Sequence, residues 1–155
     1  MRKGKRLGID VGSVRIGLAS CDADGILASP LPALGRSSSD DDVAVDIKNL
    51  AEKLEVIEVL VGDPISMSGK ITSSTSDARK LALEIAAVIT VPVRLVDERL
   101  TTVSAQMKLR QSGKDSREAK TLIDSASAVE ILEHALATER LTGNAPGVLV
   151  GDVDD

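Results

Sequence analysis

Three short runs of β-branched residues and leucine lie within the first thirty positions, and they restrict the fold more than any other feature of the chain. The turn residues Gly12-Ser13 and the segment from Asp22 to Gly25 separate these runs. Residues 6–29 are therefore predicted to form a β-meander of consecutive antiparallel strands. Pro30 and Pro32 follow and are expected to interrupt regular structure.

The rest of the chain alternates helical and strand patterns. Apolar residues at helical spacing and buried-strand runs predict a helix, a strand, a helix, a strand and two further helices. The order βββαβαβαα predicts an α/β protein with three layers and a mixed five-stranded sheet. Residues 1–140 are expected to form a single domain, and residues 141–155, which have no period, a disordered acidic tail. The predicted elements after the meander cover residues 41–55, 56–62, 77–89, 92–96, 102–113 and 116–140.

The composition limits the residue types that can form the core and indicates the cellular compartment. Of the 155 residues 43% are apolar, yet Phe, Tyr and Trp are absent. The core must therefore consist of Leu, Ile, Val, Ala and Met, and the bases of a bound nucleic acid cannot stack on aromatic rings. This absence indicates selection or deliberate engineering against aromatic residues. The single Cys21 excludes an internal disulfide and is expected to be a small buried apolar residue, which favours a cytoplasmic protein.

Several classes of protein are disfavoured. No apolar run approaches the ~18 residues that a membrane helix requires, because a glutamate and a proline break the longest candidate, residues 81–93. Asp10 and Arg15 break the N-terminal apolar stretch, which argues against a signal peptide. The only histidine, His134, lies opposite the main apolar stripe of its predicted helix and is expected at the surface. Nucleophile schemes that need a histidine base, and zinc sites, are therefore disfavoured.

Acidic residues stand at or near the ends of two predicted strands. Asp10 lies where the strand pattern requires an apolar residue, and a buried charge is costly unless a cation compensates it. The structural alternative is that Asp10 bonds the turn at Gly12-Ser13. Asp97 and Glu98 follow an apolar strand and precede a helix, a position where ligands gather in open α/β sheets. We interpret Asp97 as a capping or turn residue and Glu98 as a site residue.

A third acid emerges from helical spacing. Asp124, Ala128, Ile131 and Ala135 occupy positions i, i+4, i+7 and i+11 of the last predicted helix and therefore share one stripe. The main apolar stripe of that helix is a different one, so the helix is expected to be covered on two sides. Asp124 is then a half-buried acid beside a small residue, which makes it a site candidate.

Together the three acids indicate a metal-dependent chemistry. Carboxylates from two strand ends and one helix, with no cationic partner close in sequence, form the oxygen-ligand set that Mg²⁺ or Mn²⁺ prefers. Two such ions ~3.5–4 Å apart can activate a water and stabilise the leaving oxygen of a phosphodiester. Asp10, Glu98 and Asp124 are therefore predicted to be the metal ligands and the catalytic residues of a phosphodiester hydrolase.

Basic residues are candidates for phosphate binding. Arg15 and Arg99 flank the proposed acids, and Lys70 ends the loop that contains Pro64 and Gly69. Each of these cations could bind a substrate phosphate through a charge-assisted hydrogen bond. The alternative for each is a solvated surface charge. The net charge of −5 hides a local excess of positive charge, because residues 94–120 carry seven Lys or Arg against four acids. This distribution permits nucleic-acid binding without proving it.

Four segments carry a resemblance to a known family: GIDVGSVRIGLA (8–19), VGDPISMSG (61–69), DERLTT (97–102) and IDSASAVEIL (123–132). They resemble the successive motifs of the YqgF family, also called RuvX, which are Holliday-junction-resolvase-like proteins with a ribonuclease-H-like fold. DERLTT is highly specific, and the resemblance covers residues 6–136. It implies a small bacterial nuclease that matures the 16S rRNA precursor or, by similarity, cleaves branched DNA. Carried over residue by residue, it implies an acidic site of Asp10, Glu98 and Asp124, and it leaves open whether two copies form a homodimer.

Three residues depart from the family pattern. Val14 stands where a lysine is common, Asp63 where an apolar residue is usual, and Val96 replaces an aromatic residue. The first two changes are expected to lower the positive potential near a substrate phosphate and to weaken substrate binding.

Two other functions compete with this interpretation. The segment Asp10-Val11-Gly12-Ser13 also resembles the phosphate-binding hairpin of the actin and sugar-kinase superfamily, but those enzymes close a nucleotide between two such domains and 155 residues supply only one. A catalytically weak or inactive nucleic-acid-binding module with the same fold is the second alternative. A nuclease should be stabilised by divalent ions and should require them for cleavage, which distinguishes it from such a module.

Overall fold

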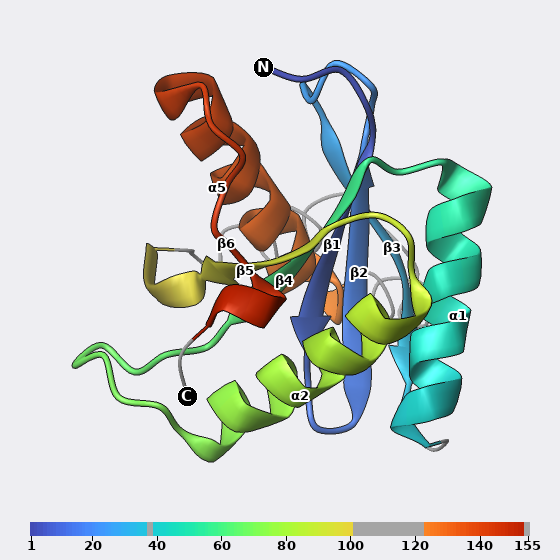
Figure 1. Ribbon diagram of the computed structural model, residues 1–155, viewed down its shortest axis with the longest axis vertical. Helices are drawn as coiled ribbons and strands as arrows, with labels where there is room; N and C mark the ends of the chain where they lie inside the picture. Colours follow the sequence, from blue (N-terminus) through green and yellow to red (C-terminus); the bar gives the residue numbers. More distant parts are fainter. Residues whose placement is uncertain (37–38, 101–122, 154–155) are drawn as a thin grey trace.

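Figure 1 shows the computed structural model of the chain, which describes residues 1–36, 39–100 and 123–153, with only the backbone for Leu100. Its strands and helices, in chain order, are β1 (Arg6–Val11), β2 (Arg15–Cys21), β3 (Ala28–Gly35), α1 (Asp40–Leu54), β4 (Glu58–Asp63), α2 (Ser73–Val88), β5 (Val93–Asp97), a 3₁₀ turn (Glu98–Leu100), α5 (Ala126–Thr142), β6 (Val148–Leu149) and a second 3₁₀ turn (Val150–Asp152). The predicted helix at 102–113 and the predicted start of the last helix lie outside the described residues.

The strands form one mixed sheet in the order β3-β2-β1-β4-β5-β6. The meander is confirmed, because β1, β2 and β3 pair antiparallel. Strand β4 then pairs in parallel with β1, and β5 pairs in parallel with β4. The carboxyl ends of β1, β4 and β5 therefore point to the same end of the sheet. The predicted α/β class with a mixed sheet is therefore confirmed, although the described residues form six strands instead of five.

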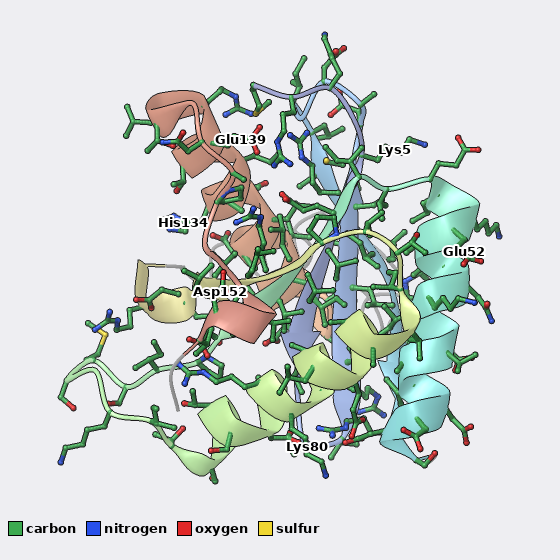
Figure 2. All side chains as sticks on the ribbon, viewed as in Figure 1. Lys5, Glu52, Lys80, His134, Glu139 and Asp152 are labelled. Carbon is green, nitrogen blue, oxygen red and sulfur yellow. The ribbon has the colours of Figure 1, made fainter. Side chains whose placement is uncertain are left out.

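Helices cover both faces of the sheet. On one face, α1 and α2 pack over an aliphatic core that includes Leu7, Ile9 and Val61. On the other face, α5 packs over a second cluster that includes Leu60 and Val96. Figure 1 shows α2 crossing the strands and α1 running alongside them, and Figure 2 shows side chains filling the spaces between the layers. Among the described residues, no helix combines the length and the apolar character needed to cross a membrane.

The sequence prediction that Pro30 and Pro32 interrupt regular structure is wrong, because β3 runs through both residues. The physical reason is the position of β3 at the edge of the sheet, where a missing backbone N–H costs no ladder hydrogen bond on the open side. The pairing of β2 with β3 does shift register between Ile16 and Leu18.

The prediction of a disordered tail over residues 141–155 is wrong for most of its length. Helix α5 continues to Thr142, where Gly143 ends it in the left-handed conformation at φ +74°. Gly147, at φ +68°, then passes so close to the Leu95 carbonyl that a Cβ would lie 2.1 Å from it. Strand β6 pairs antiparallel with β5, and the next residue, Val150, is buried in the core beneath α2. This apolar run of three residues is too short to be recognised by its period.

Helix α2 begins earlier than the predicted segment 77–89. Thr72 caps its N-terminus, and Thr75 reciprocates by accepting from the Thr72 backbone N–H at 3.0 Å. This reciprocal capping by two threonines extends the helix to Ser73 in a polar stretch without apolar period.

Buried ion pairs fix the C-terminal half of α5 to the end of the sheet opposite the proposed acids. Arg6 and Glu139 are almost fully buried and lie 3.0 Å apart, and Arg2 contacts both Glu139 and the buried Glu58. Figure 2 labels Glu139 on this part of α5. The long axis of α5 is thereby set relative to the strands that carry the acids at their other ends.

Candidate active site

Asp10 and Glu98 meet over the carboxyl ends of the parallel strands. Asp10 is the fifth residue of β1, and Glu98 is the first residue after β5. The two strands are separated by β4, whose Gly62 lies between the two acids. A Cβ on Gly62 would lie 2.5 Å from Glu98 Oε1, so the absence of a side chain there allows Glu98 to reach across β4. The carboxyl groups of Asp10 and Glu98 are hydrogen-bonded to each other.

The electrostatics of this pair follow from burial and from the proximity of like charges. Burial, the charge of Asp10 and the hydrogen bond with Asp10 raise the pKa of Glu98 to about 8, with smaller effects from Asp63 and Asp97. Burial also raises the pKa of Asp10, and the hydrogen bond with Glu98 partly offsets this increase. A protonated Glu98 that donates to the Asp10 carboxylate is the consistent arrangement near neutral pH. The pair therefore holds one proton where a cation would also be favourable.

Asp124 lies next to Asp10 but turns its carboxylate to a cation. Its backbone carbonyl packs on Gly17, the residue paired with Asp10 on β2, and a Cβ on Gly17 would lie 2.5 Å from that carbonyl. Asp124 Oδ2 lies 3.4 Å from Arg15 Nε. The same oxygen is buried and has no hydrogen-bond partner among the described residues.

The structure thus brings together two of the three predicted acids and places the third beside them. Within residues 1–36, 39–100 and 123–153, no group of three or more His, Cys, Asp or Glu is close enough to hold a metal ion. Completion of a three-carboxylate site requires the Asp124 side chain to turn from Arg15 toward Asp10. The roles of the three acids as metal ligands stay predictions.

The other predicted cations have different surroundings. The Arg99 guanidinium donates to both carboxylate oxygens of Asp97, at 2.6 Å for the shortest contact, and holds the pKa of that acid below its usual range. Asp97 Oδ1 also accepts from the Arg99 backbone N–H at 2.9 Å, so the interpretation of Asp97 as a turn residue is confirmed. Lys70 is exposed in the loop between β4 and α2, and Gly69 of that loop approaches the Arg99 guanidinium.

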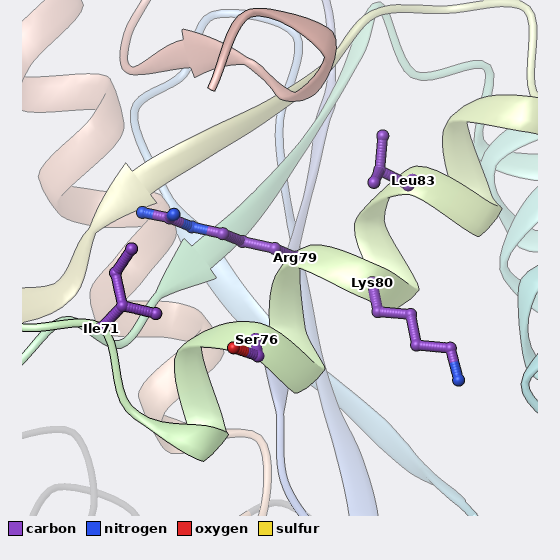
Figure 3. Close-up of a pocket in the computed structure, with 5 residues that line it drawn as sticks. All are labelled: Ile71, Ser76, Arg79, Lys80 and Leu83. Carbon is purple, nitrogen blue, oxygen red and sulfur yellow. The ribbon is translucent and has the colours of Figure 1, made fainter. Parts of the chain in front are cut away.

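Sequence reasoning missed an ion pair beneath the site. Asp63, the last residue of β4, is buried and accepts two hydrogen bonds of 2.9 Å from the Arg79 guanidinium of α2. Figure 3 shows Arg79 extending from α2 toward the strands, whereas Lys80 points away. The ion pair with Arg79 offsets part of the Asp63 charge, but Asp63 still raises the pKa of Glu98, so the expectation that Asp63 lowers the local positive potential stays a prediction. A buried acid requires a cationic partner. The position of Asp63 at the end of a buried strand could therefore have indicated that a cation lies beside it.

A second missed residue, Arg36, fixes the turn that follows Asp10. Its guanidinium donates to the Gly12 carbonyl at 3.0 Å, to Asp77 of α2 at 2.6 Å and to Asp40 of α1 at 3.0 Å. Arg36 and Arg15 line an open cavity of about 370 Å³ at the β1–β2 turn. A second cavity, of about 420 Å³, lies against Arg79 and Lys80 on α2 (Figure 3).

The structure also shows the positions of Cys21 and His134. Cys21 is buried at the end of β2, as predicted, and its sulfur accepts from the Arg6 backbone N–H at 3.4 Å. His134 is partly exposed on α5 (Figure 2), and it contributes to the lowered pKa of Asp97.

Comparisons with known proteins agree with this geometry. Residues 4–138 match the family described as RuvX, Holliday junction resolvase. A curated protein of Clavibacter michiganensis is 47% identical over 150 residues, which cover 97% of this chain and 93% of the relative. A Streptomyces avermitilis protein is 49% identical over 152 residues, which cover 95% of this chain and 94% of the relative. Both relatives are named, provisionally, as pre-16S rRNA nucleases.

The fold is also found in a solved structure. RuvC of T. thermophilus, in complex with a Holliday junction substrate, superposes with a TM-score of 0.55 at 19% identity over 90% of this chain and 97% of that chain. At this identity the similarity concerns the fold alone. The extent of the sequence match, together with the relatives that span nearly the whole chain, shows that this chain belongs to the RuvX family.

Proposed function

We propose that this chain is a metal-dependent endonuclease that hydrolyses phosphodiester bonds in structured nucleic acid. The substrate class we favour is precursor 16S rRNA, since relatives that share almost half of its residues are named for that activity. Branched DNA of the Holliday-junction type is the second substrate class, after the family description. We place the enzyme in the cytoplasm, a setting with which its one buried, unpaired cysteine agrees.

The observation that carries this proposal is the half-buried Asp10–Glu98 pair at the carboxyl ends of parallel strands. Two carboxyl groups that share one proton are unfavourable for a structural role, because both burial and mutual repulsion oppose their ionisation. Such pairs are retained at sites where a cation or a reacting group occupies the space between them. The position agrees with the rule that ligands of open α/β sheets bind beyond the carboxyl ends of the strands.

The residues present fit a divalent cation. Asp10 and Glu98 supply carboxylate oxygens, which Mg²⁺ and Mn²⁺ prefer, and Asp124 supplies a buried oxygen without a hydrogen-bond partner among the described residues. We propose these three acids as the ligands and the catalytic residues. Bound as a pair, Mg²⁺ or Mn²⁺ would supply an activated water and stabilisation of the leaving oxygen.

The protein's own side chains position the substrate in this proposal. Arg15 is 46% exposed at the rim and lies beside Asp124, so its guanidinium can bind a phosphate next to the acids. Lys70 is exposed on the neighbouring loop and is proposed to contact a more distant phosphate. Arg99 is assigned the same role, although its ion pair with Asp97 must open or share a donor. Whether two copies of the chain bind one substrate as a homodimer is left to the experiment.

One observation favours the alternative of a weak or inactive nucleic-acid-binding module. Arg15 holds the Asp124 carboxylate away from the Asp10–Glu98 pair, and Asp97 holds Arg99. A chain locked in this arrangement would bind phosphates without completing a metal site.

A cleavage panel separates the two functions. The substrates are an RNA with a 16S precursor end, an unstructured RNA and a four-way DNA junction, each tested with Mg²⁺, with Mn²⁺ and with a chelator. We expect metal-dependent cleavage of at least one structured substrate and none of the unstructured RNA. Binding of the structured substrates without cleavage under any condition would establish the inactive module instead.

A further inference from the structure

We propose that Ser125 is a positioning residue that sets Asp124 against the Asp10–Glu98 pair, a role that rests on the metal site proposed above. Ser125 follows Asp124 directly and precedes the first residue of α5. Its side chain is fully buried against the sheet. Any shift of Ser125 relative to the strands therefore moves the peptide that carries the Asp124 carboxylate.

The hydroxyl of Ser125 bridges two strands. It accepts from the Leu18 backbone N–H of β2 at 3.0 Å and donates to the Leu31 carbonyl of β3 at 2.6 Å. Leu18 and Leu31 are partners in the ladder, at the point where the pairing shifts register. The hydroxyl thus joins the two strands where their own pairing is irregular, and it anchors the start of α5 to both of them.

This use of the side chain is distinct from helix capping. Ser125 occupies the N-cap position of α5, where a serine hydroxyl usually accepts from the first turn of its own helix. In the described structure it makes no such hydrogen bond, and its backbone has φ −101° and ψ 1° instead of the extended cap conformation. The hydroxyl is committed to the sheet, so its function is to dock the helix start and not to stabilise the helix locally.

A second contact restricts the same peptide. The Asp124 carbonyl lies over Gly17, where a side chain would collide with it, and Gly17 pairs with Asp10. The main chain of Asp124 is thereby fixed on two sides, by the Ser125 hydroxyl and by the close approach to Gly17. Ser125 therefore holds the peptide from which the Asp124 carboxylate extends.

The test measures Mn²⁺ binding by the metal-free protein in a double-mutant cycle of Ser125→Ala and Asp124→Asn. Calorimetric titration of Mn²⁺ alone gives the affinity, and a thermal melt of each variant gives its stability. We expect Ser125→Ala to weaken Mn²⁺ binding by about 10- to 100-fold, the range found for residues that orient metal ligands. In the Asp124→Asn background the same substitution should lower the melting temperature equally but weaken Mn²⁺ binding no further.

Two additional variants make the result decisive. Ser125→Cys keeps a weak donor and acceptor and should bind Mn²⁺ with intermediate affinity, which decides the matter if Ser125→Ala does not fold. Thr75→Val is the matched control: Thr75 is also fully buried and donates to the Pro64 carbonyl at 2.6 Å, but on the opposite face of the sheet. It should lower the melting temperature and leave Mn²⁺ affinity unchanged.

The outcomes distinguish this inference from the proposed function. Ser125 variants that melt lower yet bind Mn²⁺ like the wild type overturn the positioning role and leave the metal site standing. A loss of affinity that persists in full in the Asp124→Asn background also overturns it, because Ser125 would then act by another route. If Asp124→Asn itself binds Mn²⁺ as tightly as the wild type, Asp124 is not a ligand and the positioning role falls with that assignment.

Discussion

Replacement of Glu98 by Gln should stabilise the metal-free protein at neutral pH. Glu98 has an ordinary pKa of 4.5, and burial beside Asp10 raises its pKa to about 8 in the folded state. Between these two values the folded chain holds a proton that the unfolded chain has released. Stability is therefore fully present below pH 4.5 and is lost progressively as the pH rises toward about 8. The Gln side chain is neutral throughout and can still donate to the Asp10 carboxylate.

The magnitude follows from the size of the shift. One pKa unit corresponds to about 1.36 kcal/mol, so the wild type forfeits at most about 3 kcal/mol between pH 4.5 and pH 7. Glu98 is only partly buried, and solvent screening reduces this figure, so we expect Glu98→Gln to gain about 1–3 kcal/mol at pH 7. For a chain of this length each kcal/mol raises the melting temperature by about 2–4 °C.

Thermal melts followed by circular dichroism at pH 4 and pH 7, with a chelator present, measure the effect; tryptophan fluorescence has no source in this sequence. The matched control is Asp97→Asn, one residue away. The pKa of Asp97 is lowered by Arg99, and the resulting stabilisation is lost only as the pH falls below the ordinary value of 3.8, so this variant should be destabilised at both pH 7 and pH 4. An advantage of Glu98→Gln that is equal at pH 4 and pH 7, or absent at pH 7, would refute the shared-proton arrangement.

Two further predictions concern the cations. Arg79→Met should cost about 3–5 kcal/mol of stability by chemical denaturation, because it leaves Asp63 buried without its partner, and adding Asp63→Leu should recover most of the loss; an unstable double variant would argue against a purely electrostatic cost. Arg15→Gln should weaken binding of a structured RNA and reduce the slope of log affinity against log salt by about 1, as expected for one lost phosphate contact; an unchanged slope across a salt series would remove Arg15 from the substrate site.

The sequence was sufficient to predict the sheet class because that class depends on strong local patterns, and the choice of the three candidate acids rests on patterns of the same kind. The meander has turn residues at fixed intervals, and Asp10 interrupts an apolar strand where no surface residue is expected. The sixth strand was not predictable in this way. Strand β6 has only two residues, and it pairs with β5 where Gly147 brings the chain against that strand. Period alone cannot detect a strand that short.

Within the candidate site, the sequence indicated which residues to consider but not which side chains they contact. The proximity of Asp10 to Glu98 depends on the register of three parallel strands and on the empty space over Gly62. Spacing in sequence says nothing about either. Asp63 lies in β4 and Arg79 in α2, so their contact could not be inferred from spacing in the sequence. The contact of Arg15 with Asp124 was missed for the same reason.

The most direct test of the account is single-turnover cleavage of a structured precursor RNA by the wild type, Asp10→Asn and Asp97→Asn in the presence of Mn²⁺. Asp10 belongs to the acid pair, whereas Asp97 lies at the same end of the sheet and is paired with Arg99. Both variants replace an aspartate by asparagine, so they change the charge equally. We expect cleavage by the wild type and by Asp97→Asn, and loss of cleavage in Asp10→Asn with the fold intact by circular dichroism. Undiminished cleavage by Asp10→Asn would contradict the assignment of the active site.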